Sequence, residues 1–505
     1  MTRSYATATT EALGVDDIGS LVAGAIVPGR GAIVTIEDPA TGTVAHRYAD
    51  AGADVAAMAL AAAEEGGRAW RKLTASARGL ALFRAAELIR ARSEQLALIE
   101  AVTAGKPIRD ARVEVARVAD MFTFYAGYTD KLNGNVVPVP TSHLNIVLRE
   151  PLGTIVQLTP WNAPIFTAGW QLAPALAAGN AVVLKPSELT PVSSIALAML
   201  LEQAGVPRGA VNVVAGFGAT SGQRLVSDTS VGRVVFIGSV PTGRNVAQLA
   251  AAVGRPSLLE LGGKSANIVF GDADLARAAK AAQAAIFAGA GQSCTAGSRL
   301  LVERPAFARM LEWVSTGAKR LEVGHPLDER TEMGPINNRQ QYERIMAAIA
   351  RGQQEGACLA AGGGRPERPE CREGFFVAPT VFADVAPSMS IAREEIFGPV
   401  LCVIPFDDEA EAIALANDGE FDLAGAVWTR DLTRGHRVAR QLRAGTVWVN
   451  AYRSLSVMSP FGGMSGSGFG RSSGVDVLRE YTQSRSIWVE TDDNAPLPFG
   501  YGPED

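Results

Sequence analysis

The chain has 505 residues, of which 47% are hydrophobic and 20% are charged, and its formal net charge is −5 at pH 7. At roughly 150 residues per domain, this length predicts about three domains and is ample for a large buried core. The mild acidity does not fit a nucleic-acid-binding role, because such proteins cluster Lys and Arg along the phosphate backbone.

Cysteines and histidines are few and scattered. The four cysteines (Cys294, Cys358, Cys371 and Cys402) show no Cys-x-x-Cys spacing, and the chain has four histidines. The sequence therefore predicts neither a disulfide framework nor a metal centre. It has no run of about 18 uncharged apolar residues and no apolar signal segment near its start. We expect a cytoplasmic protein that does not insert into a membrane.

The first third of the chain is predicted to be mainly helical. Residues 52–70 and 76–104 carry Ala and Leu at helical spacing. Ser76 is the expected cap of the second helix, and Gly105-Lys106-Pro107 is its expected end. Residues 144–150 alternate between apolar and polar side chains and predict a half-exposed strand.

From Pro151 the pattern changes to short apolar runs separated by helices. The expected strands are 153–158, 181–184, 211–214 and 234–237, and the expected helices are 168–178, 192–204, 219–227 and 242–252. This alternation predicts a doubly wound parallel sheet covered on both faces. Ligands bind at the carboxyl ends of such strands, so chemistry is expected in the loops after Leu158, Leu184 and Ile237.

A second α/β region is expected to begin near Glu260. Its predicted strands are 265–270, 299–302, 400–405, 425–429 and 445–450, and its predicted helices are 273–288 and 305–320. Residues 361–374 lack periodicity and predict a surface loop. The acidic, Pro/Gly-rich tail from about residue 490 is expected to be disordered or to lie on a neighbouring chain.

Cys294 is the first candidate for chemistry. Glycines at 289, 291 and 297 surround it directly after an Ala-rich helix. Such a loop lets the backbone approach a ligand and leaves a thiolate accessible. A lone cysteine is more often a small buried apolar side chain, which is the alternative interpretation.

Two further segments offer a base and a hydrogen-bond donor. In Glu260-Leu-Gly-Gly-Lys264, a partly desolvated carboxylate can deprotonate water or a thiol; a turn with solvated ends is the alternative. In Thr159-Pro-Trp-Asn-Ala-Pro164, the amide of Asn162 suits an oxyanion; a proline-rich turn is the alternative.

Two segments at strand ends are candidates for dinucleotide binding. Lys185-Pro-Ser-Glu188 can grip a ribose, although a surface ion pair is the alternative. Phe236-Ile-Gly-Ser-Val-Pro-Thr-Gly243 joins a strand to a helix, where free N–H groups favour a pyrophosphate. The chain lacks the G-x-G-x-x-G spacing, so this signal alone is weak.

Together these segments resemble the aldehyde dehydrogenase superfamily across roughly residues 25–490. Seven of them, in the family's order and spacing, carry the resemblance: TPWNAP (159–164), KPSE (185–188), FIGSVPTG (236–243), ELGGK (260–264), GQSC (291–294), EEIFGPV (394–400) and PFGG (460–463). Each segment alone is weak, but seven in register are very specific.

The resemblance implies an α/β, aldehyde dehydrogenase-like fold. Its parts are a Rossmann-like dinucleotide-binding domain (1–133 and 153–259), a catalytic domain (260–452), a small β oligomerisation arm (134–152 and 478–492) and a flexible tail (493–505). The family's cofactor domain binds the dinucleotide without the usual glycine fingerprint. The arm implies a homodimer or homotetramer.

The resemblance also implies the roles of individual residues. Cys294 is the nucleophile, Glu260 the general base and Asn162 the oxyanion donor, joined by the backbone amide of Cys294. Lys185 and Glu188 hold the adenine ribose. The implied cofactor-binding set is Thr159, Trp161, Lys185, Ser187, Glu188, Gly218, Gly222, Phe236, Gly238, Ser239, Leu261, Glu395 and Phe397.

The implied chemistry is oxidation of a small-molecule aldehyde to a carboxylic acid through a thiohemiacetal and a thioester on Cys294. Relatives that pass the acyl group to coenzyme A lack a glutamate at the position of Glu260, so its presence favours release of the free acid. Many hydrolytic relatives have a glutamate after the Gly-Arg near the C-terminus. Here Ser472 stands there, so Glu260 is expected to act alone.

The cofactor and the substrate follow less directly from the resemblance. NAD is expected because Glu188 would repel a 2′-phosphate, although some relatives with this residue accept NADP. The implied substrate tunnel consists of Ala163, Thr167, Trp170, Arg453, Leu455 and Phe461. Ala163 and Leu455 replace aromatic residues of small-aldehyde enzymes, which favours a bulkier aldehyde. Arg453 is either a partner for an anionic substrate or a surface arginine on the interface loop.

Two other functions compete with this interpretation. One is an ester or thioester hydrolase that uses Cys294 without a redox step, against which the ribose and pyrophosphate segments argue. The other is a non-catalytic member of the fold, which would be free to lose Cys294, Glu260 or Asn162; all three are present.

Overall fold

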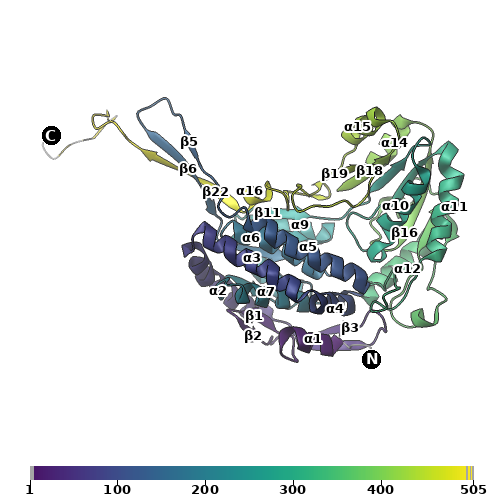
Figure 1. Ribbon diagram of the computed structural model, residues 1–505, viewed down its shortest axis with the longest axis horizontal. Coiled ribbons are helices and arrows are strands. Elements are labelled where there is room, and N and C mark those ends of the chain that lie inside the picture. Colours follow the sequence, from purple (N-terminus) through teal and green to yellow (C-terminus); the bar gives the residue numbers. More distant parts are fainter. Residues whose placement is uncertain (1–4, 496, 498, 501, 503–505) are drawn as a thin grey trace.

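Two large sheets form the centres of two lobes, and a third, three-stranded sheet projects from the first lobe as an arm (Figure 1). The computed structural model describes residues 5–495, 497, 499–500 and 502. Within these residues, no helix is long and apolar enough to cross a membrane.

The sheet of the first lobe has eight strands in the order β2-β1-β9-β8-β7-β10-β11-β21. The strands from β9 to β11 pair in parallel, whereas β1, β2 and β21 add antiparallel edges. Their bounds are β1 (Ser20–Val22), β2 (Ala25–Val27), β7 (Thr154–Leu158), β8 (Ala181–Lys185), β9 (Val211–Val213), β10 (Val231–Ile237), β11 (Ser257–Glu260) and β21 (Gly468–Phe469).

Both faces of this sheet are buried, as its near-continuous apolar strands predicted. Alternate strand residues point to opposite faces. Ile155 and Val182 pack against helices α3 to α7, and Val156 and Val183 pack against α2, α8 and α9. The helices are α1 (Tyr5–Leu13), α2 (Gly52–Lys72), α3 (Ala75–Ala91), α4 (Ser93–Ala104), α5 (Ile108–Ala126), α6 (Pro164–Ala177), α7 (Val192–Gln203), η1 (Gly218–Gly222), α8 (Gln223–Val226) and α9 (Val240–Ala252).

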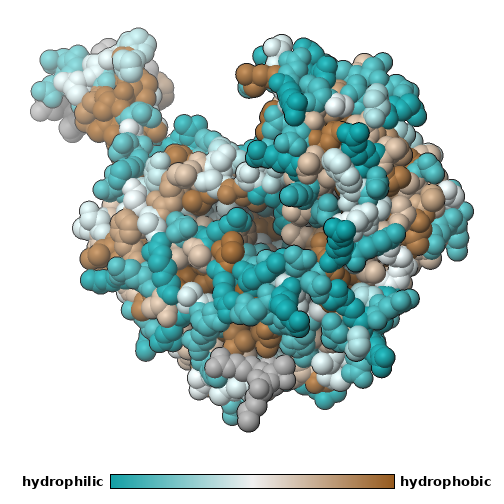
Figure 2. Space-filling view, turned by 45° about the vertical axis from the view of Figure 1, so that its right-hand side comes forward, coloured by the Kyte–Doolittle hydropathy of each residue, from teal (hydrophilic) through white to brown (hydrophobic). Residues whose placement is uncertain are grey.

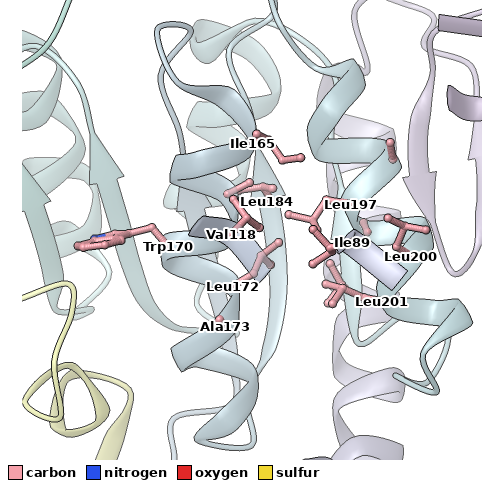
Figure 3. Packing of buried hydrophobic residues seen from close by; sticks show 14 of the residues in the cluster. Ile89, Val118, Ile165, Trp170, Leu172, Ala173, Leu184, Leu197, Leu200 and Leu201 are labelled. Carbon is pink, nitrogen blue, oxygen red and sulfur yellow. The ribbon is translucent and has the colours of Figure 1, made fainter. Parts of the chain in front are cut away.

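Helix α6 lies at the centre of the larger cluster. Figure 3 shows Ile165 and Leu172 on α6 beside Val118, Ile89 and Leu197, which come from other helices. Burying each such side chain contributes about 1.5–3 kcal/mol. Helix α6 begins four residues earlier than predicted, because Pro164 stands at its first turn, where a missing N–H costs nothing.

The prediction of one helix over 76–104 is wrong. The chain leaves helical geometry at Arg92 (φ −107°, ψ 16°), which separates α3 from α4. Both helices bury apolar residues in the same cluster, and a single straight helix would not place both sets there. The cap is Thr74, which accepts a hydrogen bond from the Ala77 N–H at 3.2 Å, instead of Ser76. The helix does end at Gly105, in left-handed geometry.

The second lobe holds a seven-stranded sheet in the order β14-β15-β16-β13-β12-β18-β19, parallel except at β14. Its strands are β12 (Ala266–Val269), β13 (Arg299–Glu303), β14 (Cys358–Ala361), β15 (Thr380–Ala383), β16 (Val400–Phe406), β18 (Ala424–Trp428) and β19 (Thr446–Val449). Its helices are α10 (Leu275–Phe287), η2 (Ala288–Gly291), α11 (Arg304–Arg320), α12 (Arg339–Gln354), η3 (Pro369–Cys371), α13 (Ser390–Arg393), α14 (Glu409–Asn417) and α15 (Leu432–Gln441).

The arm is an antiparallel sheet in the order β22-β6-β5, with β5 (Asn135–Val137), β6 (Leu144–Pro151) and β22 (Thr482–Val489). Its two longer strands pair along their whole length, from Thr482 opposite Pro151 to Val489 opposite Leu144. Apolar side chains gather on its surface (Figure 2), and Val136 is 68% exposed. The predicted flexible tail (493–505) includes residues 496, 498, 501 and 503–505, which lie outside the described residues.

Short elements complete the chain. They are the hairpin β3 (Ile33–Glu37) and β4 (Val44–Ala49), the pair β17 (Phe421–Asp422) and β20 (Met464–Ser465), and helix α16 (Val477–Glu480).

Candidate active site

Residues from both lobes line a cavity of about 660 Å³. Asn162 comes from the loop after β7, Glu260 from the end of β11 and Cys294 from the loop after α10, and all three line this cavity. Three segments that are distant in sequence therefore meet at one cavity.

The Cys294 loop owes its shape to three consecutive residues in left-handed geometry. Gly289, Ala290 and Gly291 have φ values of 63°, 54° and 69°. A Cβ on Gly291 would lie 2.1 Å from the carbonyl oxygen of Gly398, so a side chain cannot fit there. These residues turn the chain sharply after α10 and bring the half-buried Cys294 to the cavity wall.

Asn162 is tied directly to the cysteine loop. Its Nδ2 donates a hydrogen bond of 2.8 Å to the carbonyl oxygen of Gln292, two residues before Cys294. The Gln292 Oε1 in turn accepts from the Asn337 backbone N–H at 2.9 Å, which anchors the loop. A carboxamide nitrogen carries two donors, and the second hydrogen of Asn162 has no acceptor within the described part of the chain.

Glu260 is a buried carboxyl at the end of a strand that the sequence did not predict. It is 6% exposed, and its Oε1 has no hydrogen-bond partner among the described residues. Burial raises the pKa of Glu260 to about 8, opposed by its contact with Trp170 and the charge of Arg471. At neutral pH this carboxyl is poised to exchange a proton.

The two glycines after Glu260 allow close packing around the cysteine. A Cβ on Gly262 would lie 2.3 Å from Glu395 Oε2, and one on Gly263 would lie 2.3 Å from the carbonyl oxygen of Cys294. The Gly263 N–H donates to Glu395 Oε1 at 3.0 Å. The ELGGK segment therefore joins the base, the cysteine loop and Glu395.

The Cys294 thiol is held in its neutral form. Burial raises its pKa to about 12, and the negative charges of Glu260 and Glu395 act in the same direction, whereas Arg453 opposes them. Because the thiolate is the nucleophile, the thiol needs a base to activate it. Glu260 lines the same cavity as Cys294 and is the candidate for that role.

Trp170 forms an aromatic wall of the cavity with two other rings. It stacks on Phe166 at 5.4 Å between ring centres and meets Phe461 edge-on at 6.1 Å. Its Nε1 donates to the Ser472 hydroxyl at 2.8 Å. In Figure 3, Trp170 points away from Ile165 and Leu172, so α6 serves the core with one face and the cavity with another. The predicted tunnel residues Ala163, Thr167, Trp170, Arg453, Leu455 and Phe461 all line the cavity.

Six of the predicted cofactor residues line the same cavity: Trp161, Gly238, Ser239, Leu261, Glu395 and Phe397. Trp161 and Phe397 meet edge-on at 5.4 Å, and Phe397 has a positive φ of 56°. Ser239 precedes helix α9, whose N-terminus has no side-chain cap. Its free N–H groups suit an anionic pyrophosphate.

The other predicted cofactor residues lie outside this cavity, at the carboxyl ends of β7, β8 and β10 or in η1, which follows β9: Thr159, Lys185, Ser187, Glu188, Gly218, Gly222 and Phe236. The Thr159 N–H donates to the Lys185 carbonyl at 3.1 Å. Lys185 Nζ lies 4.0 Å from Glu188 Oε2, and burial lowers the pKa of this lysine. The buried Thr159 hydroxyl has no partner in the described chain, so polar groups here fit a sugar-phosphate ligand.

The cavity residues that the sequence analysis did not select include Lys106, Glu114, Arg117 and Phe166. Three of them lie on or just before α5, which was not predicted. Glu114 and Arg117 are three residues apart and share one helix face. This spacing could have identified a charged helix face. That the face lines the cavity becomes visible only from the packing of α5 against α6.

This arrangement is that of a nicotinamide-dependent dehydrogenase acting on a carbonyl compound, since a nucleophilic thiol lies beside the ligand-binding edge of a doubly wound sheet. Residues 26–487 match the profile described as "Aldehyde dehydrogenase family". The chain belongs to the aldehyde dehydrogenase family.

Several characterised proteins are similar to the chain over almost its whole length. Betaine aldehyde dehydrogenase of Mesorhizobium japonicum is 44% identical over 92% of the chain and 96% of its own length. The structure of betaine aldehyde dehydrogenase from Staphylococcus aureus in complex with NAD+ has a TM-score of 0.94 and 34% identity, and covers 99% of each chain. PnpE from Pseudomonas sp. WBC-3 has a TM-score of 0.93 and 39% identity, and covers 96% of this chain and 99% of its own.

These similarities confirm the predicted family, fold class and enzyme class. The protein is an aldehyde dehydrogenase, an oxidoreductase, and NAD, the predicted cofactor, is bound in the Staphylococcus aureus relative.

Proposed function

We propose that Cys294, Glu260 and Asn162 carry out the oxidation of an aldehyde to its free carboxylic acid. The convergence of these three side chains on one cavity beside Glu395 and Phe397 supports this assignment most strongly. The bond between Asn162 and the Gln292 carbonyl fixes the amide relative to the cysteine loop.

In the first half of the reaction, Glu260 takes the proton of the Cys294 thiol, and the sulfur attacks the aldehyde carbon. The oxygen of the resulting thiohemiacetal accepts hydrogen bonds from Asn162 Nδ2 and the Cys294 backbone N–H, which stabilise its negative charge. Bound NAD supplies the hydride acceptor for the oxidation. The product on the enzyme is a thioester of Cys294.

Glu260 passes the thiol proton to solvent before the second half. It then removes a proton from water, whose oxygen attacks the thioester carbon. The carbon–sulfur bond breaks, the acid leaves, and the Cys294 thiolate recovers a proton. Ser472 accepts a hydrogen bond from Trp170 and donates one to the carbonyl oxygen of Phe461 at 3.3 Å, so its hydroxyl is engaged and holds the aromatic wall in place. We assign the base role to Glu260 alone.

The preference for NAD over NADP is assigned to Glu188. This half-buried carboxylate lies beside the buried Lys185 ammonium at a strand end that suits the adenine ribose. A 2′-phosphate there would face the Glu188 charge, whereas ribose hydroxyls can donate to it. Uncapped N–H groups at the start of α9 would hold the pyrophosphate.

The three sheets support the proposed domain boundaries and assembly. We assign residues 1–133 and 153–259 to the cofactor domain, 260–452 to the catalytic domain, and 134–152 with 478–492 to the arm. Exposed apolar side chains on the arm, including Trp488 at 54% exposure, fit a contact between protomers of a homodimer or homotetramer. Trp488→Asp should release smaller species in light scattering, whereas an unchanged mass would contradict this use of the arm.

The proposed reaction is tested with a panel of aldehydes and both nicotinamide cofactors. The panel contains aliphatic, aromatic and carboxylated aldehydes, and betaine aldehyde because relatives are named for it. Reduced nicotinamide is followed by absorbance, and the acid product is identified. The proposal predicts stoichiometric acid and reduced NAD, both lost in Cys294→Ala. Acid formation from esters without NAD would contradict it.

A further inference from the structure

One group of residues in the cavity wall, from α5 and from the loop after β19, carries an excess of positive charge. We call this region the tunnel mouth and define it as Lys106, Glu114, Arg117, Arg453 and Leu455. Helix α5 and the segment before it supply the first three residues, and the loop after β19 supplies the other two. All five residues line the same cavity, which brings helix α5 and the loop after β19 together.

Lys106 does not contribute free charge to the tunnel mouth. It is 7% exposed, its Nζ donates to Glu114, and it lies 3.9 Å from the fully buried Glu100. Glu100 also accepts from the Ile165 N–H at 3.1 Å. Burial raises the pKa of Glu100 to about 7. The charge of Lys106 is therefore neutralised by Glu100 and Glu114, and Glu100 also caps the start of α6.

Arg453 and Arg117 are the cations that remain. Arg453 is half-buried, and its Nη1 makes one long hydrogen bond of 3.3 Å to the Ala288 carbonyl. Arg117 is exposed on the cavity side of α5. Neither guanidinium has a carboxylate within ion-pair distance in the described chain. A half-buried cation without a counter-ion is unfavourable unless a ligand supplies one.

Arg453 lies close to the proposed chemistry. Its Nη1 donates to the Ala288 carbonyl, in the segment that leads to Cys294, and its side chain lines the same cavity as the thiol. The apolar side chains of Phe166, Trp170 and Phe461 line the same cavity, together with the small Ala163. The cavity therefore combines a thiol, an aromatic wall and two guanidinium groups that have no carboxylate within ion-pair distance in the described chain.

We propose that the tunnel mouth is an anion subsite, in which Arg117 and Arg453 bind a carboxylate at the far end of the aldehyde substrate. The substrate class is then an oxo-carboxylic acid with an apolar or unsaturated chain. This inference rests on the proposed oxidation at Cys294 and specifies what that site accepts. A trimethylammonium aldehyde in the same position would face two cations, which would disfavour it despite the aromatic wall.

The test compares three aldehydes of equal chain length that end in a carboxylate, its methyl ester or a trimethylammonium group. The wild-type enzyme should show kcat/KM at least tenfold higher for the carboxylate than for the ester. Arg453→Gln and Arg117→Gln should each reduce this ratio at least fivefold and the double variant should abolish it, mainly through KM. Oxidation of the ester should persist in each variant, which shows that the protein is folded.

Arg112→Gln is the matched control. Arg112 lies on the same helix but pairs with Glu94 and Glu329 and does not line the cavity. Its variant should keep the wild-type ratio. Equal Cys294-dependent oxidation of all three aldehydes, or an unchanged ratio in both cavity variants, overturns the anion subsite and leaves the proposed reaction intact. If none of the three is oxidised in a Cys294-dependent manner, both proposals fail.

Discussion

At the catalytic centre the ionisable groups are neutral, whereas at the tunnel mouth they are charged. Burial keeps the pKa of Cys294 near 12 and that of Glu260 near 8, so both hold their protons at pH 7. Arg117 and Arg453 are guanidinium groups and remain protonated. The two regions share one cavity, yet one is built for proton transfer and the other for attraction of charge.

This difference separates the origin of the chemistry from that of specificity. The catalytic centre is made by the segments after β7 and β11 and by the loop after α10, where Gly262, Gly263 and Gly291 allow backbones to approach closely. The tunnel mouth is made by side chains on a helix face and on a loop, which can change without disturbing those contacts. We therefore expect changes at the centre to act on kcat for every aldehyde and changes at the mouth to act on the choice among aldehydes.

The largest effect is expected for Cys294→Ala. Loss of the nucleophile should reduce kcat by about 10⁴-fold or more for every substrate. The measurement is steady-state formation of reduced NAD, with NAD binding checked separately by fluorescence. Residual activity within tenfold of the wild type would show that the carbonyl carbon is not attacked by this sulfur.

Replacement of Glu260 by Gln should reduce kcat by about 10²–10⁴-fold, because it removes the base for both halves of the reaction. Glu260 acts as a base only after it loses its proton. The wild-type rate should therefore rise with pH up to about 8, since the folded-state pKa is about 8. A rising limb of the same midpoint in Glu260→Gln would assign the titration to another group.

Asn162→Ala should reduce kcat by about 10²–10³-fold with little change in KM, because the amide stabilises charge that develops only during the reaction. The same variant loses the bond to the Gln292 carbonyl. Gln292→Ala, which disturbs the loop but keeps the amide, serves as the comparison and should lose much less activity. If the two variants are equally impaired, Asn162 acts only by holding the loop.

A smaller change is expected for Glu188→Gln, which should raise the NADP/NAD ratio of kcat/KM about tenfold. The removal of charge repulsion worth about 1.4 kcal/mol corresponds to that factor. The Lys185 ammonium remains to attract a 2′-phosphate. A ratio equal to that of the wild type would refute the role of Glu188.

The neutral catalytic centre should also affect stability. The folded state keeps the Glu260 proton up to a pKa of about 8, whereas an exposed glutamate releases it near its ordinary value of 4.5. Wild-type stability should therefore fall as the pH rises from about 4.5 to 8, by up to about 1.4 kcal/mol per pH unit from this group. Glu260→Gln should lack this slope in thermal unfolding between pH 5 and pH 8. Parallel profiles would contradict a buried, protonated Glu260.

How far the sequence could predict these two regions depends on how local their signals are. The catalytic centre consists of short segments, two at strand ends and one after a helix, and each has its own local pattern, so Asn162, Glu260 and Cys294 could be selected without a structure. The tunnel mouth depends on α5 and the loop after β19 lining one cavity, and no local pattern encodes that arrangement. Arg453 was selected by the resemblance, whereas Arg117 was missed.

The same limit applies to the fold. The apolar strands of the first sheet were predicted closely, because a strand buried on both faces is a continuous apolar run. The break between α3 and α4 at Arg92 was not predicted, because it depends on how these two helices pack into one core. Likewise, the bond between Trp170 and Ser472 joins residues 302 apart in sequence.

The most direct test of the account is to trap the acyl group on Cys294. Glu260→Gln is incubated with NAD and an oxidisable aldehyde, quenched in acid, digested and analysed by mass spectrometry. The account predicts an acyl adduct on the peptide that contains Cys294, accumulating in this variant but not in the wild type, where the thioester is hydrolysed. An adduct on another residue, or acid released by the variant at the wild-type rate, would contradict it.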